Sequence, residues 1–112
     1  MPNFANPFTG DEYAPLNDQE LAQAVRFSIA AEYEAVQVYQ RIAAATAHKL
    51  AKKVLAGIVD EELVHVGELL TLLHEIVPDE EAQYEEGERE VQYLQVGTYP
   101  AKGFPAPYKA GK

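Results

Sequence analysis

Two long segments of the sequence repeat apolar residues at alternating steps of four and three, the spacing of a single buried face on an α-helix. The first segment runs from about residue 18 to 45 and the second from about 49 to 77. An acidic residue interrupts each stripe near its middle, Glu32 in the first and Glu62 in the second. The spacing predicts two long helices with polar groups on their buried faces. The predicted buried positions are Leu21, Val25, Ser28, Glu32, Ala35, Tyr39 and Ile42 in the first helix, and Ala51, Leu55, Ile58, Glu62, His65, Leu69, Leu72 and Ile76 in the second.

Local signals predict where these helices begin and end. Asn17 can cap the first helix, and Glu20, three residues later, completes a capping box. Residues 46–48 are the expected turn between the helices. Pro78 ends the second helix, and the acids that follow it suit the first turn of a third, shorter helix that ends at about Gln95.

The sequence predicts three regions: an extended arm at 1–16, a helical domain at 17–96, and a tail rich in proline and glycine at 97–112. The predicted fold class is all-α, an antiparallel two-helix hairpin followed by a short C-terminal helix. A chain of 112 residues has difficulty burying a large core alone. We therefore expect two copies to pair into a four-helix bundle.

Composition excludes several classes of function. Eighteen acidic residues against nine Lys and Arg give a formal charge of -9, which disfavours nucleic acid as a partner and attracts cations. The absence of cysteine excludes disulfides, iron-sulfur clusters and thiol nucleophiles. The N-terminus lacks the features of a secretion signal, and no apolar run approaches the roughly 18 residues of a membrane span. We expect a cytoplasmic protein that does not bind a membrane.

The candidate chemistry lies in three residues of the two stripes. Glu62 and His65 form an E-x-x-H pair, whose side chains point the same way from adjacent helical turns and can bind one ion together. The motif alone is weak, but a buried ionised carboxylate is costly unless a charge or a metal compensates it. Glu32 is a second carboxylate predicted to be buried, on the first helix. Neither stripe contains a Lys or Arg that could compensate the two charges. The alternative is a structural polar cluster at a dimer seam.

The number of ligands predicts a site shared between two chains. Di-metal carboxylate bundles use one Glu from each of two helices and an E-x-x-H from each of two others, and this chain encodes half of that set. Hard oxygens with one imidazole per metal favour iron or manganese, with zinc as the main competitor. Tyr39, two turns after Glu32, is either a hydrogen-bond partner of a metal ligand or a core tyrosine.

Across residues 18–95 the sequence resembles the encapsulated ferritins, most specifically at 32–39 and 60–65. The resemblance implies a ferritin-like bundle and a di-iron ferroxidase centre of Glu32, Glu62 and His65 across a two-chain interface, with Tyr39 beside it. It also implies dimers that close into a ring, typically a decamer, carried inside an encapsulin shell in the cytoplasm.

Two positions depart from the family pattern that this resemblance implies. Glu34 matches one of the acids that gather cations in these proteins, but the companion position is Ala31 here. Val38 stands where an aromatic residue is expected. These departures concern the cation-gathering residues and leave the di-iron ligands intact.

The expected function is oxidation of Fe2+ to Fe3+ for iron storage or detoxification. One alternative is another di-metal enzyme of iron or manganese, such as a peroxidase or catalase. The absence of cysteine disfavours a complete rubrerythrin among these. A second alternative is a helical metal-binding adaptor without turnover, whose proline-rich tail recruits a partner.

Overall fold

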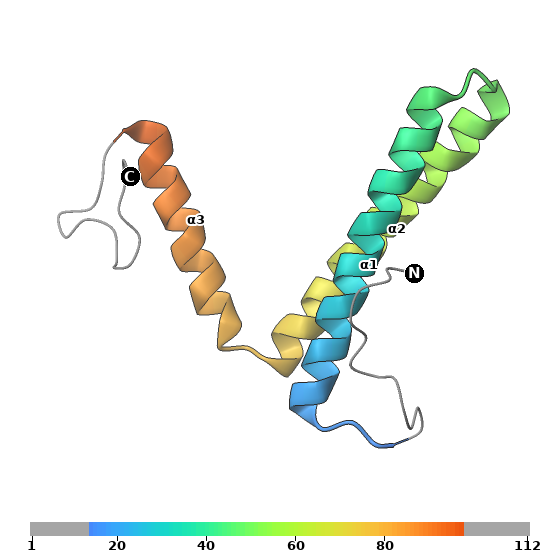
Figure 1. The fold of residues 1–112 in the computed structure, drawn as a ribbon. Helices are drawn as coiled ribbons and strands as arrows, with labels where there is room; N and C mark the ends of the chain where they lie inside the picture. Colours follow the sequence, from blue (N-terminus) through green and yellow to red (C-terminus); the bar gives the residue numbers. More distant parts are fainter. Residues whose placement is uncertain (1–13, 98–112) are drawn as a thin grey trace. The chain divides into compact units, whose positions relative to one another are not determined.

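The computed structural model describes residues 14–97, which form three helices and contain no strand (Figure 1). Helix α1 is Asp18–Ala45, α2 is Lys49–Ile76 and α3 is Glu80–Val96. This arrangement confirms the all-α prediction, and each helix boundary agrees with its expected position to within about two residues. Most of the predicted arm and most of the predicted tail lie outside the described residues.

The start of α1 is fixed by the predicted capping box. The side-chain oxygen of Asn17 accepts a hydrogen bond from the backbone N–H of Glu20 at 2.8 Å. In return, the carboxylate of Glu20 accepts one from the backbone N–H of Asn17 at 3.1 Å. These bonds satisfy two backbone donors at the N-terminus of the helix with groups from the same turn.

A three-residue turn joins α1 to α2 and makes the two helices an antiparallel pair (Figure 1). His48 caps α2, because its Nδ1 accepts a hydrogen bond from the backbone N–H of Ala51 at 3.1 Å. Lys52 donates from Nζ to the backbone carbonyl of Ala43 at 2.7 Å and so ties the first turn of α2 to the last turns of α1. The turn at 46–48 was correctly predicted.

The core is a narrow seam along which α1 packs on α2. Its buried side chains in α2 recur every seven residues, the repeat typical of two helices in coiled-coil contact. In α1, two of them lie in the first turns, where they form a cluster with Leu73, and the third lies past the middle of the helix. The buried residues are Ala22, Val25 and Val36 in α1, and Val59, Val66 and Leu73 in α2.

The predicted register of the buried stripe was wrong by one residue in α2, whereas in α1 the predicted position Val25 is buried and the other two buried positions each follow a predicted one. In α2 the buried positions are Val59, Val66 and Leu73 rather than the preceding Ile58, His65 and Leu72. One residue is a rotation of about 100 degrees, so the predicted stripe borders the seam instead of filling it. Among the predicted buried positions, Ser28, Ile42, His65 and Leu72 are exposed.

Internal contacts divide the chain into two units at the boundary between Val77 and Pro78. Helix α3 belongs to the second unit and has no buried residue. It ends at Gly97, whose φ of 70 degrees lies in the left-handed region that glycine adopts without strain. Over residues 14–97 no helix has the length and apolar character needed to cross a membrane.

Candidate metal centre

The hairpin brings Glu32 level with Glu62 across the seam. Glu32 lies 13 residues before the end of α1 at Ala45, and Glu62 lies 13 residues after the start of α2 at Lys49. Antiparallel helices joined by a short turn place residues at equal distances from the turn beside each other. His65 follows one turn after Glu62 on the same helix. The topology alone therefore assembles the three predicted ligands.

Each of these three residues offers one ligand atom, and the three atoms lie within 4.8 Å of one another. The Nδ1 atom of His65 is 3.6 Å from Oε2 of Glu32 and 3.9 Å from Oε2 of Glu62. Both distances exceed those of a hydrogen bond. They are close to the roughly 3 to 4 Å that separates ligands of one ion when each metal–ligand bond is about 2.1 Å. The donor set and its spacing therefore fit a divalent cation.

The site is partly exposed, which corrects the expectation that its ligands are buried. The side chains of Glu32 and Glu62 are 24% and 19% exposed, and that of His65 is 47% exposed. One atom is nevertheless isolated from solvent: Oε2 of Glu32 is buried and accepts no hydrogen bond. A buried carboxylate oxygen without a donor is unfavourable. A cation between Glu32 and His65 would satisfy it.

A surface pocket of about 310 Å³ opens beside two of the ligands. Tyr39 lines it together with Glu32 and Glu62, so the candidate tyrosine lies at the site, half-buried. Its hydroxyl has no hydrogen-bond partner within residues 14–97. Glu34 also lines the pocket but does not belong to the three-ligand cluster. The remaining lining residues are Ala31, Ala35 and Val38.

Known proteins have similar sequences and a similar fold. No protein-family model matches the chain. A ferritin-like–encapsulin shell fusion protein of Pyrococcus furiosus is 30% identical over 89 residues, 80% of this chain and 26% of that protein. An encapsulin nanocompartment cargo protein of Myxococcus xanthus is 29% identical over 93 residues, 83% of this chain and 72% of the relative.

The crystal structure of the encapsulated ferritin domain from Pyrococcus furiosus superposes with a TM-score of 0.74 at 29% identity, covering 83% of this chain and 95% of that domain. The chain resembles the encapsulated ferritins in both sequence and fold. The resemblance inferred from the two motifs is thereby confirmed, together with the ferritin-like fold. The chain matches only about a quarter of the fusion protein's length.

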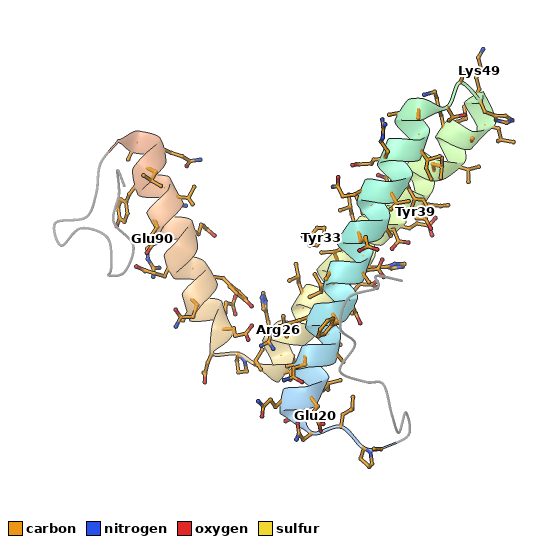
Figure 2. The ribbon with its side chains drawn as sticks, in the orientation of Figure 1. Glu20, Arg26, Tyr33, Tyr39, Lys49 and Glu90 are labelled. Carbon is orange, nitrogen blue, oxygen red and sulfur yellow. The ribbon has the colours of Figure 1, made fainter. Side chains whose placement is uncertain are left out.

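The pocket beside the candidate ligands was not predicted. Its lining includes the small side chains of Ala31 and Ala35, which lie one turn apart on α1. Two alanines four residues apart leave a depression on a helix surface. That spacing was the available signal in the sequence. Tyr33 shows the contrast, because it is exposed and projects from a different side of α1 than Tyr39 (Figure 2).

Proposed function

We propose that the chain is a ferroxidase that binds Fe2+ at Glu32, Glu62 and His65 and oxidises it to Fe3+. The observation that carries the proposal is the cluster itself: three ligand atoms within 4.8 Å, one of them on a buried carboxylate that lacks a hydrogen-bond donor. Two carboxylates and one imidazole are the donor types expected for iron in a helical bundle.

A second copy of the chain would complete the centre. One chain supplies three ligands, and two chains would supply two Glu32, two Glu62 and two His65 for a pair of iron ions. Support comes from large apolar side chains of α1 and α2 that are exposed in the single chain and that a second copy could cover. These exposed residues are Val38, Ile42, Val54 and Leu72.

The redox step balances with dioxygen as the electron acceptor. Two Fe2+ ions each release one electron, and dioxygen with two protons takes up both electrons to give hydrogen peroxide. With peroxide as the acceptor, the same two electrons and two protons give two water molecules. Anionic carboxylates of Glu32 and Glu62 stabilise Fe3+ more than Fe2+, which favours oxidation, and the Fe3+ product then leaves for storage.

The Fe3+ product needs a compartment in which it can be stored. Neither a helical hairpin nor a pair of hairpins forms a storage cavity, so the iron needs a separate compartment. Relatives of this chain are named as an encapsulin cargo protein and as a fusion to an encapsulin shell. We therefore include in the proposal that the protein oxidises iron inside an encapsulin shell in the cytoplasm.

Oxygen consumption by metal-free protein after addition of Fe2+ tests the activity. We expect uptake by the wild type and its loss in Glu32→Ala and in His65→Ala. Glu61→Ala is the matched control, because Glu61 is an exposed neighbour of Glu62 that lies outside the cluster. Equal uptake by all four proteins would exclude the assigned centre, and uptake by none would exclude ferroxidase activity.

A further inference from the structure

The pocket beside the candidate ligands is lined by hydrogen-bonding groups that the described chain leaves unused. The buried Oε2 atom of Glu32 accepts no hydrogen bond, and the hydroxyl of Tyr39 has no partner within residues 14–97. Both residues line the pocket, together with Glu34 and Glu62. Each carboxylate has two oxygens, so a glutamate that binds a metal ion still has an oxygen that can accept a hydrogen bond. The pocket therefore suits a small polar molecule in addition to the metal ions.

The pocket is open because the side chains between these groups are small. Ala35 lies three residues after Glu32 and four before Tyr39, so it stands between them on the surface of α1. Ala31 and Val38 also line the pocket and add little bulk. A volume of about 310 Å³ is large enough for a molecule of two oxygen atoms together with several water molecules. A second substrate of that size therefore fits beside the ligands.

Polarity and charge favour hydrogen peroxide over other small oxidants of iron. Hydrogen peroxide is uncharged at neutral pH and carries two O–H donors, which match the carboxylate acceptors of the pocket. Dioxygen is apolar and has no hydrogen to donate to a carboxylate. Superoxide is an anion, which the three glutamates that line the pocket repel. The groups of the pocket are therefore complementary to peroxide.

The side chains around the pocket are also ones that peroxide does not readily oxidise. Apart from Tyr39, the residues that line it are Ala, Val and Glu, which contain neither sulfur nor an aromatic ring. Thiolates and thioethers are the side chains that oxidants of this kind attack. The whole sequence has no cysteine and one methionine, Met1. The composition of the pocket is therefore compatible with repeated exposure to peroxide.

We propose that hydrogen peroxide is the preferred oxidant of this centre and that it binds in the pocket between Glu32 and Tyr39. This role rests on the proposed ferroxidase function, for which it names the electron acceptor. Two Fe2+ ions give one electron each to the peroxide, its O–O bond breaks, and two protons from solvent complete two water molecules. A single Fe2+ ion would instead give hydroxide and a hydroxyl radical. Reduction by two ions of a shared centre therefore avoids release of the radical.

Stopped-flow absorbance of anaerobic protein loaded with Fe2+ compares the two oxidants at equal concentration. We expect hydrogen peroxide to oxidise the bound iron about tenfold or more faster than dioxygen, with two Fe3+ formed per peroxide. A peroxide rate equal to or below the dioxygen rate overturns this inference and leaves the proposed ferroxidase function in place. No oxidation by either oxidant overturns both.

A radical trap separates reaction at the centre from reaction of free Fe2+. His65→Ala lacks one of the three ligands, so Fe2+ mixed with it reacts with peroxide in solution, one electron at a time. At the same concentrations of iron and peroxide, we expect the wild type to yield severalfold less trapped hydroxyl radical than His65→Ala. Equal yields would show that iron outside the centre reduces the peroxide, and would overturn the inference.

Filling the pocket tests where the peroxide binds. Ala35→Leu places a larger side chain between Glu32 and Tyr39, and Ala31→Leu narrows the pocket from the preceding turn. Ala30→Leu is the matched control, because Ala30 is exposed on α1 and does not line the pocket. We expect each pocket variant to lower the peroxide rate about tenfold while the amount of Fe2+ bound without oxygen stays the same. The control should match the wild type in both quantities.

Three results of this comparison would overturn binding of peroxide in the pocket. The first is a wild-type peroxide rate in both pocket variants. The second is an equal fall of the rate in Ala30→Leu, which would make the effect unrelated to the pocket. The third is a loss of bound Fe2+ in both pocket variants with no change in the rate per bound ion, which would make the pocket part of the cation site.

An oxygen electrode gives an independent check in air. Dioxygen reduced by two Fe2+ yields hydrogen peroxide, and a centre that prefers peroxide then consumes it with two further Fe2+. We therefore expect four Fe2+ to be oxidised per dioxygen, and catalase added at the end to return no dioxygen. A ratio of two Fe2+ per dioxygen, with half of the consumed dioxygen returned by catalase, contradicts the use of peroxide by this centre.

Discussion

The Nδ1 atom of His65 on α2 lies 3.6 Å from Oε2 of Glu32 on α1, and that carboxylate oxygen is buried without a hydrogen bond. The pair therefore brackets a gap that is too wide for a hydrogen bond and suited to a cation. Because the two residues belong to different helices, an ion between them would also fasten α1 to α2.

Metal binding should therefore stabilise the fold. We expect Fe2+, added without oxygen, to raise the melting temperature of the wild type, since a ligand that binds only the folded state stabilises it. Without metal, the free energy of unfolding of His65→Ala should lie within about 0.5 kcal/mol of the wild-type value, because the side chain is half-exposed. The variant should lose the increase in melting temperature that Fe2+ causes. Thermal melting followed by circular dichroism measures both. A full shift in His65→Ala would remove His65 from the site.

Removal of the charge of Glu32 should leave the metal-free protein at least as stable as the wild type. Glu32→Gln keeps the shape of the side chain and removes the uncompensated charge next to a buried oxygen. We expect the metal-free variant to be as stable as the wild type or more stable in urea, and to bind no Fe2+ in an anaerobic titration. A variant that is less stable without metal would indicate that the carboxylate has a structural partner.

Tyr39→Phe separates a role of the hydroxyl from a role of the ring. Tyr39 lines the pocket with Glu32 and Glu62, and its ring remains in the variant. If the hydroxyl donates to a ligand or water at the centre, the rate of Fe2+ oxidation should fall severalfold while the amount of iron bound stays the same. Stopped-flow absorbance and metal analysis give the two quantities. An unchanged rate would leave Tyr39 as a packing residue.

Because Leu73 lies in the seam and Leu63 does not, substitution of these two leucines of α2 should cause very different losses of stability. Leu73 is 3% exposed and belongs to the core cluster, whereas Leu63 is 46% exposed. Leu73→Ala should destabilise the protein by about 2 to 4 kcal/mol and Leu63→Ala by less than about 1 kcal/mol. Urea unfolding measures both. Similar losses would mean that another chain covers Leu63.

The helices were predictable because their ends are determined by local chemistry. Asn17 and Glu20 satisfy each other's backbone donors without help from the rest of the chain, and Pro78 cannot continue a helix. The proximity of the candidate ligands was predictable for a related reason. Equal distances of Glu32 and Glu62 from a short turn place them side by side in any antiparallel hairpin.

The faces of the helices were harder to predict, because two adjacent registers of α2 are both apolar. Ile58 precedes Val59, and Leu72 precedes Leu73, so periodicity alone cannot choose between the two stripes. Only the pair of His65 and Val66 distinguishes them, and the buried member is Val66. Apolar residues on both sides of a helix reflect two separate packing surfaces, and a single sequence does not say which surface is covered within its own chain.

The exposure of His65 also has a consequence for the speed of metal loading. An ion arriving from water can reach the imidazole without separation of α1 from α2, because nearly half of that side chain is already at the surface. Rotation of an exposed side chain takes picoseconds to nanoseconds. If the centre binds metal as proposed, capture of the first ion by a single chain would not be gated by protein motion, and the slow event in building a two-ion centre would be the encounter of two chains.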